Sequence, residues 1–99
     1  MKDNYKGQAI GIFELDNLVA CYVALDAASK AADVKIQGVE RNRLKSGACV
    51  KMRGDISNVN AAMEVALKTA EPIAKIVSST VIASPTEGTD VAMDMTILK

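Results

Sequence analysis

Four short segments of the chain are rich in apolar and β-branched residues, and this pattern predicts four β-strands. The segments are residues 8–15, 34–39, 48–53 and 76–83. In the third segment an apolar face alternates with a second face made of Cys49, Lys51 and Arg53. One apolar and one charged face favour an antiparallel strand with one side in solvent.

Two segments between these strands carry apolar residues at helical spacing. Residues 18–32 are rich in Ala and predict a first helix, and a second helix follows the turn at residues 54–57. We expect Asp16 to cap the first helix and Asp55 or Ser57 to cap the second, because their side-chain oxygens can accept from free first-turn amides. We expect residues 86–90 to form an exposed loop, whereas residues 91–99 have no decisive pattern and are left without a predicted element.

The resulting order, β-α-β-β-α-β, predicts an α+β fold of the ferredoxin-like kind. Such a fold has a four-stranded antiparallel sheet with both helices packed on one face. The length of 99 residues suits one domain. With 49% hydrophobic but only 3% aromatic residues, the core must consist of aliphatic side chains. A core this small gains stability from association with other chains.

The composition excludes several classes of function. The chain has no histidine, which removes Ser-His and Cys-His catalysis and His-liganded zinc. Twelve basic residues balance twelve acidic ones, so nucleic acid is not an expected partner. No apolar run approaches the roughly 20 residues of a membrane helix, and the N-terminus leads into no secretory segment. We therefore expect a cytoplasmic protein without a membrane partner, a metal or another cofactor, with Cys21 and Cys49 as reduced thiols.

Four stretches of the chain resemble, in order, the single-domain, hexamer-forming class of the bacterial microcompartment shell family (BMC domain). They are Ala9–Glu14, Leu18 with Leu25–Val34, Val50–Ile56 with Val59 and Ala61–Ala62, and Val81–Pro85. The third is similar to the family's Val-Arg-Gly-Asp-Val turn into the second helix. The resemblance implies an N-terminal extension (residues 1–7), a shell domain (residues 8–85) and a C-terminal tail (residues 86–99).

The resemblance also implies a structural, non-enzymatic role. Six copies would form a cyclic homohexamer, a flat tile with a central pore. Tiles would join other shell proteins edge to edge into a microcompartment shell in the cytoplasm. This shell would surround encapsulated enzymes, and small metabolites would cross it through the pores.

The same resemblance places the pore loop at residues 41–47, one residue longer than the family's usual Lys-Ile-Gly-Ser-Gly loop. The implied pore-lining residues are Arg43, Leu44, Lys45, Ser46 and Gly47. A six-fold axis would repeat Arg43 or Lys45 into a ring of positive charge that favours anions. Two alternatives stay open: Leu44 narrows the pore, or the charges lie on the tile face, solvated or paired with Glu40.

Two implied edge positions differ in how well they match the family. Lys30 matches the Lys that lies along the tile edge, although an ordinary solvated helix residue is the alternative. Ser84 stands where the family has Arg, so tiling without partner tiles is in doubt. Cys49 follows the pore loop, and some relatives hold an iron–sulfur cluster near the axis. A free thiol is the favoured interpretation here, because no cysteine lies within the loop.

Two other classes of function are weighed against the shell protein. A regulatory module of the same topology would bind a small ligand between subunits and form dimers or trimers. A small enzyme would need acid, base or amine groups, and the candidates are Glu14, Asp26, Asp55 and Lys51. These four do not cluster in the sequence. The oligomeric state would distinguish a six-fold tile from both.

Overall fold

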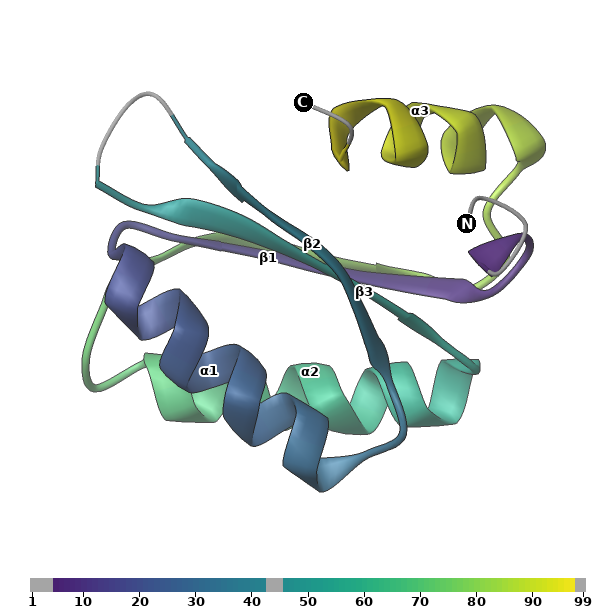
Figure 1. Ribbon diagram of the computed structural model, residues 1–99. Coiled ribbons are helices and arrows are strands. Elements are labelled where there is room, and N and C mark those ends of the chain that lie inside the picture. The colour runs from purple at the N-terminus through teal and green to yellow at the C-terminus, as the bar shows by residue number, and fades with distance from the viewer. Residues whose placement is uncertain (1–4, 43–45, 98–99) are drawn as a thin grey trace.

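The computed structural model describes residues 5–42 and 46–97 and contains seven elements (Figure 1). In chain order they are β1 (Ala9–Leu15), α1 (Leu18–Ala31), β2 (Lys35–Arg41), β3 (Ala48–Gly54), α2 (Ile56–Ala70), β4 (Ile76–Ile82) and α3 (Glu87–Ile97). The strands form one sheet in the order β2-β3-β1-β4, and every neighbouring pair is antiparallel. The predicted ferredoxin-like α+β fold is confirmed.

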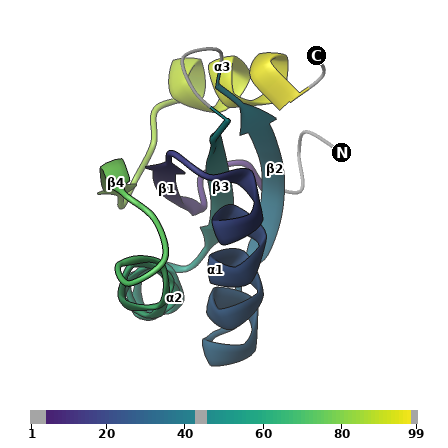
Figure 2. The same ribbon diagram turned by 90° about the vertical axis from the view of Figure 1, so that its left-hand side faces the viewer.

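The helices lie on both sides of this sheet. As predicted, α1 and α2 pack side by side against one face, and α3 lies over the opposite face (Figure 2). The third helix was not predicted: the expectation of a loop at residues 86–90 is wrong, and residues 91–99 gave no decisive pattern. The sequence did contain two features typical of the start of a helix. Thr86 caps α3, its Oγ1 accepting from the backbone N–H of Thr89 at 3.2 Å. Glu87 supplies a negative charge to the first turn. None of the described helices has the length and apolar character needed to cross a membrane.

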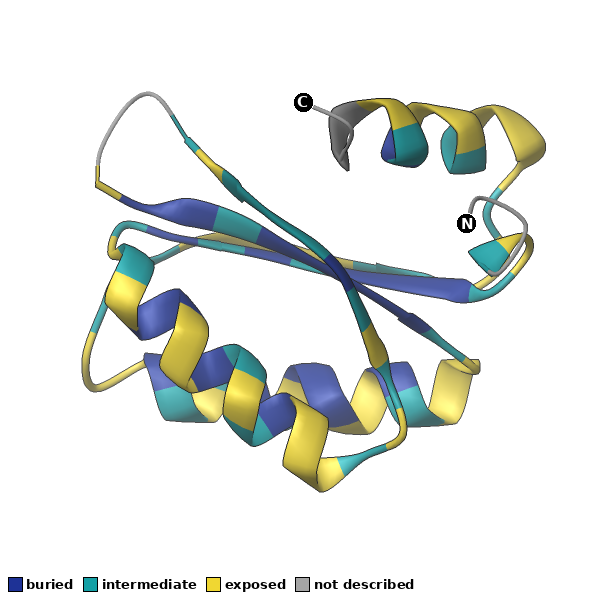
Figure 3. Cartoon of the chain, viewed as in Figure 1, coloured by how far each residue is buried: buried dark blue, intermediate teal, exposed yellow. Residues whose placement is uncertain are grey.

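The apolar core fills the space between the sheet and the first two helices (Figure 3). Its helical contribution comes mainly from alanines spaced four residues apart, Ala20, Ala24 and Ala28 on α1 and Ala62, Ala66 and Ala70 on α2. Small side chains let the helix backbones approach the sheet closely. Gly11 shows how closely, because a Cβ built there would lie 2.9 Å from side-chain atoms of Met52, Met63 and Val59.

The caps of the first two helices differ in how well they were predicted. Asp55 caps α2 as expected, its Oδ1 accepting from the backbone N–H of Asn58 at 3.1 Å. The expectation for α1 is wrong: Asn17 is its cap, and its Oδ1 accepts from the N–H of Ala20 at 2.9 Å. The carboxylate of Asp16 is used elsewhere, accepting from the N–H of Lys75 at 3.0 Å.

The second face of β3 is not in solvent, contrary to the expectation for that strand. Lys51 is 6% exposed and Arg53 only 1% exposed. Arg53 is covered by the N-terminal turn at residues 5–8 and by α3, both of which accept hydrogen bonds from its guanidinium. The charged residues on the second face of β3 therefore lie in a second buried region, which is partly polar.

Candidate functional site

The connection between β2 and β3 carries the implied pore loop, and the structure describes its two ends. The predicted pore residues Arg43, Leu44 and Lys45 lie outside the described residues. At the base of the loop the backbone N–H of Asn42 donates to the carbonyl of Gly47 at 3.1 Å. Ser46 is exposed and Gly47 is buried. This hydrogen bond closes the loop directly beyond the last paired strand residues.

Two further contacts attach the loop base to the body of the domain. The side-chain amide of Asn42 donates to Glu14 Oε2 on β1 at 2.9 Å, and the N–H of Leu18 donates to the Ser46 carbonyl at 2.8 Å. Neither contact was predicted, because each joins residues that are far apart in the sequence. The loop base is therefore held by β1 and by the start of α1.

Gly47 is required at the loop base by close backbone packing. A Cβ on this residue would lie 2.0 Å from the carbonyl oxygen of Leu15 and 2.8 Å from Cα of Asp16. Both atoms belong to the backbone, so neither can rotate away. Any larger residue would push the loop base off β1.

A row of polar side chains crosses the sheet beside the loop, on the face opposite α1. The register places Glu14 of β1 and Glu40 of β2 on either side of Cys49. Glu40 Oε1 forms a salt bridge with Lys51 Nζ at 3.0 Å. Glu40 thus has a cationic partner within the sheet.

Cys49 has the electrostatics of a protonated thiol. Burial raises its pKa most, and the charges of Glu14 and Glu40 raise it further, while Lys51 lowers it. Burial likewise raises the pKa of Cys21, whose Sγ donates to the Ala48 carbonyl at 3.4 Å. Among the described residues no group of three or more His, Cys, Asp or Glu side chains could hold a metal ion. A cluster at Cys49 would need thiols from other copies of the chain.

The two implied edge residues lie in solvent and make no described contact with each other. Lys30 Nζ pairs with Asp26 Oδ2 one helical turn earlier on α1, at 2.8 Å. The hydrogen bond and the charge of Asp26 raise the pKa of Lys30. Ser84 is exposed just beyond β4.

Apolar side chains are exposed on the outer face of α1 and near β4. Val19, Tyr22 and Val23 are 71%, 54% and 45% exposed. Ile73 and Val77 are each about half exposed. Apolar side chains gathered on one helix face are typical of surfaces that other chains cover.

The carboxylates and the amine proposed for an enzyme each have a structural partner among the described residues. Glu14 accepts from Asn42, Asp26 pairs with Lys30, and Asp55 caps α2. Lys51 is bound to Glu40. These contacts give each group a structural role.

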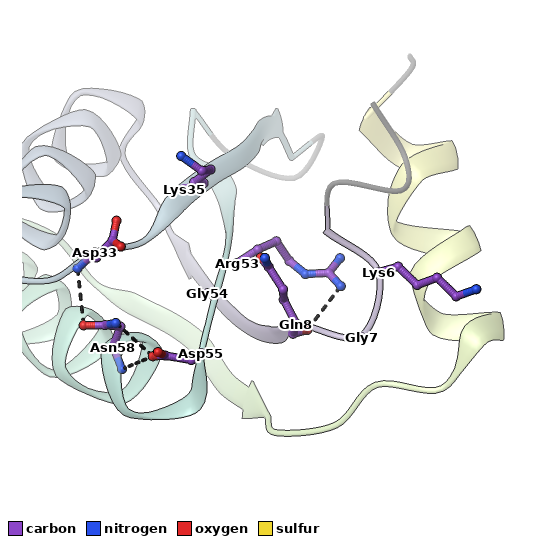
Figure 4. A pocket seen from close by; sticks show the side chains of 9 residues that line it. All are labelled: Lys6, Gly7, Gln8, Asp33, Lys35, Arg53, Gly54, Asp55 and Asn58. Carbon is purple, nitrogen blue, oxygen red and sulfur yellow. Dashed lines mark hydrogen bonds between the residues drawn. The ribbon is translucent and has the colours of Figure 1, made fainter.

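An open hollow of about 530 Å³ lies between the N-terminal turn and the start of α2 (Figure 4). Lys6 and Lys35 line it, but so do Asp33 and Asp55. Asn58 bridges its acidic side: its Oδ1 accepts from the N–H of Asp33 and its Nδ2 donates to Asp55. Opposite charges in similar number favour no single class of ligand.

Known proteins with similar sequences and structures agree on one family. The BMC domain matches residues 9–85. The bacterial microcompartment shell protein EutM of Salmonella typhimurium is 39% identical over 79 residues, which cover 79% of this chain and 80% of EutM. The shell protein PduT of Citrobacter freundii is 37% identical over 83 residues, 83% of this chain but 45% of PduT.

A solved structure supports the fold. The crystal structure of a microcompartments protein from Desulfitobacterium hafniense DCB matches with a TM-score of 0.77, over 90% of this chain and 48% of that one. At 18% identity this similarity shows the fold alone. The family match spans most of the chain, and EutM is similar over most of its own length. The chain therefore belongs to the BMC domain family and is a bacterial microcompartment shell protein.

Proposed function

We propose that six copies of this chain form a cyclic tile whose central pore is lined by the loop between β2 and β3. The observation that carries the proposal is the attachment of the loop base. Asn42 is hydrogen-bonded to Gly47 and to β1, and Ser46 accepts a hydrogen bond from the start of α1. A loop base held in this way is fixed relative to the sheet, as the base of a pore lining requires.

The proposed pore passes small anionic metabolites. Arg41 is exposed at the end of β2, and Arg43 and Lys45 follow it in the sequence. Glu40, the nearest acidic residue along the chain, already pairs with Lys51. Six-fold symmetry would multiply the positive charge of these residues, and a ring of Lys or Arg favours anions over cations.

Exposed apolar side chains support assembly. Val19, Tyr22 and Val23 on α1, together with Ile73 and Val77, give an isolated chain apolar surface that contacts between copies would bury. Lys30 lies about two to three turns further along α1 than Val19, Tyr22 and Val23, at the proposed tile edge. Because Ser84 offers no cation there, we propose that the tile joins companion shell proteins rather than only its own copies. The finished shell would enclose the enzymes of its compartment.

Native mass spectrometry at near-physiological salt tests the assembly. A mass of six chains is expected. A stable dimer or trimer would contradict the tile and favour the alternative, a regulatory module that binds a small ligand between subunits. That module would also show ligand-dependent thermal stabilisation.

Ion selectivity tests the pore. Hexamers reconstituted in a planar bilayer under a KCl gradient should show a reversal potential of the sign expected for anion preference. Lys45→Glu should shift it towards cation preference, because six positive charges become six negative ones. Lys68→Glu, which makes the same change on the exposed surface of α2, is the matched control. Equal selectivity in wild type and Lys45→Glu would exclude a charged pore.

A further inference from the structure

The C-terminal helix is attached to the sheet in an unusual way for a small domain. Among the described residues of α3, Met93 is the buried apolar side chain, whereas Val91 and Met95 are 52% and 63% exposed. The family match ends at residue 85, so the whole helix lies outside it. The contacts that the structure describes between α3 and the rest of the chain include several hydrogen bonds and a salt bridge.

These contacts meet at Arg53, inside the matched domain. One terminal nitrogen of its guanidinium donates to Asp90 of α3 and to the carbonyls of Tyr5 and Gln8 in the N-terminal turn. The other donates to Gln37 Oε1 of β2 at 3.1 Å. Figure 4 shows the side chain of Arg53 extending from β3 towards Gln8 and Gly7. The Tyr5 ring lies 5.8 Å from the guanidinium carbon, a cation–π distance.

Gln37 brings a second carboxylate of α3 into the same network. Its Nε2 donates to Asp94 Oδ1 at 3.2 Å while its Oε1 accepts from Arg53. Gln37 lies at a β-bulge, where the pairing of β2 with β3 shifts register between Ile36 and Gly38. A bulge redirects a side chain relative to its neighbours. Asp90 and Asp94 are one helical turn apart, so both face the sheet together.

The N-terminal turn completes the contact around Asp90. The backbone N–H of Gly7 donates to Asp90 Oδ2 at 3.1 Å, and Gly7 has a φ of 77°, which favours glycine. Burial acts to raise the pKa of Asp90. The hydrogen bonds from Gly7 and Arg53 and the charges of Arg53 and Lys6 outweigh it and lower that pKa. Asp90 is thus held as a carboxylate. We call Arg53, Gln37, Asp90 and Asp94 the Arg53 cluster.

Not every hydrogen-bond donor of the Arg53 cluster has an acceptor among the described residues when α3 is docked. Nε of Arg53 is buried and has no hydrogen-bond partner among the described residues. A buried donor without an acceptor opposes the docked state, because water would bind it if the helix left. A helix of 11 residues is also marginal in water by itself. Docking and helix formation of the tail therefore depend on the same few polar contacts.

We propose that α3 is a detachable cover, held on the sheet by the Arg53 cluster and released as a unit while the β1–β4 domain stays folded. Release would expose Arg53, Gln37 and the buried Ile10 that pairs with Arg53 across β1 and β3. The proposal does not depend on the hexamer, since all of its contacts lie within one chain.

Hydrogen–deuterium exchange of the full chain, read by mass spectrometry, tests the proposal. In Asp90→Asn, peptides from residues 87–97 should exchange at least tenfold faster, while peptides from β1, β3 and α2 keep their wild-type rates. Glu87→Gln removes the same charge from the exposed first turn of the same helix and is the matched control. It should change the exchange of α3 by less than fivefold, because it removes only the interaction of a first-turn charge with the helix dipole.

Every other result overturns the proposal. Equal exchange of α3 in Asp90→Asn and wild type would show that the Arg53 cluster does not hold it. Faster exchange in both regions together would show that α3 is an inseparable part of the domain. If Asp90→Asn does not fold, wild type alone decides: residues 87–97 must exchange faster than β1 and β3, and equal protection contradicts a detachable cover.

Discussion

The two faces of the sheet are covered by helices in opposite ways. On one face, α1 and α2 contribute alanines to a continuous apolar core with Phe13 and Leu15, all fully or almost fully buried. On the other, the described part of α3 is attached through the Arg53 cluster and the buried side chain of Met93. Apolar burial is non-directional and adds with area, whereas a charged cluster depends on each partner. The first face should therefore determine whether the chain folds, and the second whether its tail is docked.

The largest expected effect comes from truncating the apolar face. Phe13→Ala removes a fully buried ring, and such a change costs about 3–5 kcal/mol of the free energy of unfolding. Urea unfolding followed by circular dichroism measures this loss. Asp90→Asn on the other face should cost less in the same experiment. A larger loss for Asp90→Asn than for Phe13→Ala would reverse the ranking of the two faces.

The second prediction concerns overpacking of the apolar face. Gly11→Ala would place a methyl group 2.9 Å from Met52, Met63 and Val59, and forced insertion of this kind typically costs about 1–3 kcal/mol. The loss should appear as a lower urea midpoint with an unchanged slope. Unchanged stability would mean that the methionines adjust freely and that this face is less tightly packed than its distances indicate.

The third prediction is a pH dependence confined to the polar face. The pKa of Asp90 in the docked state lies below its ordinary value of 3.8. The stabilisation of the docked helix by the ionised carboxylate of Asp90 is therefore complete at pH values above 3.8. It is lost as the pH falls through the lower pKa that Asp90 has in the docked state. The groups that face this carboxylate are Arg53, Lys6, the Gly7 amide and Asp94.

Amide NMR spectra between neutral pH and pH values below 3.8 measure this step. Signals from residues 87–97 should shift before those of α1 and α2. Asp90→Asn should lack the early step. A single transition shared by all amides in wild type would show that the two faces respond to acid as one unit.

The sequence predicted the apolar face well because its signals are local. Strand patterns and helical spacing located every strand and the starts of the first two helices to within one or two residues, and Asp55 was one of the two residues expected to cap the second helix. The contacts of the polar face were not predicted, because they join residues that are distant in the sequence. Arg53 meets Asp90 37 residues later, and Gln37 reaches Asp94 over 57 residues. In the sequence, Lys51 and Arg53 could not be told from an ordinary solvated strand face.

The candidate site was predictable in the same uneven way. The resemblance located the loop, and the structure shows why Gly47 must stand at its base. The anchoring pair Glu14 and Asn42 was not anticipated, because only the antiparallel pairing of β1, β3 and β2 brings these residues together. The charges of Arg43 and Lys45 stay a prediction, since both lie outside the described residues.

The smallest expected effect is a gain in the stability of α3, the helix on the polar face. Gly88 lies in the first turn of α3, and an added Cβ would meet only Thr86 Oγ1, at 3.9 Å. Alanine is a better helix former, so Gly88→Ala should stabilise α3 by about 0.5–1 kcal/mol. Exchange of residues 87–97 should slow by roughly two- to fivefold, since about 1.4 kcal/mol corresponds to a factor of ten. β1 should keep its rate, because its protection comes from the apolar face. Equal slowing in β1 would mean that the tail and the domain open together, and the distinction between the two faces would then describe their chemistry but not their stability.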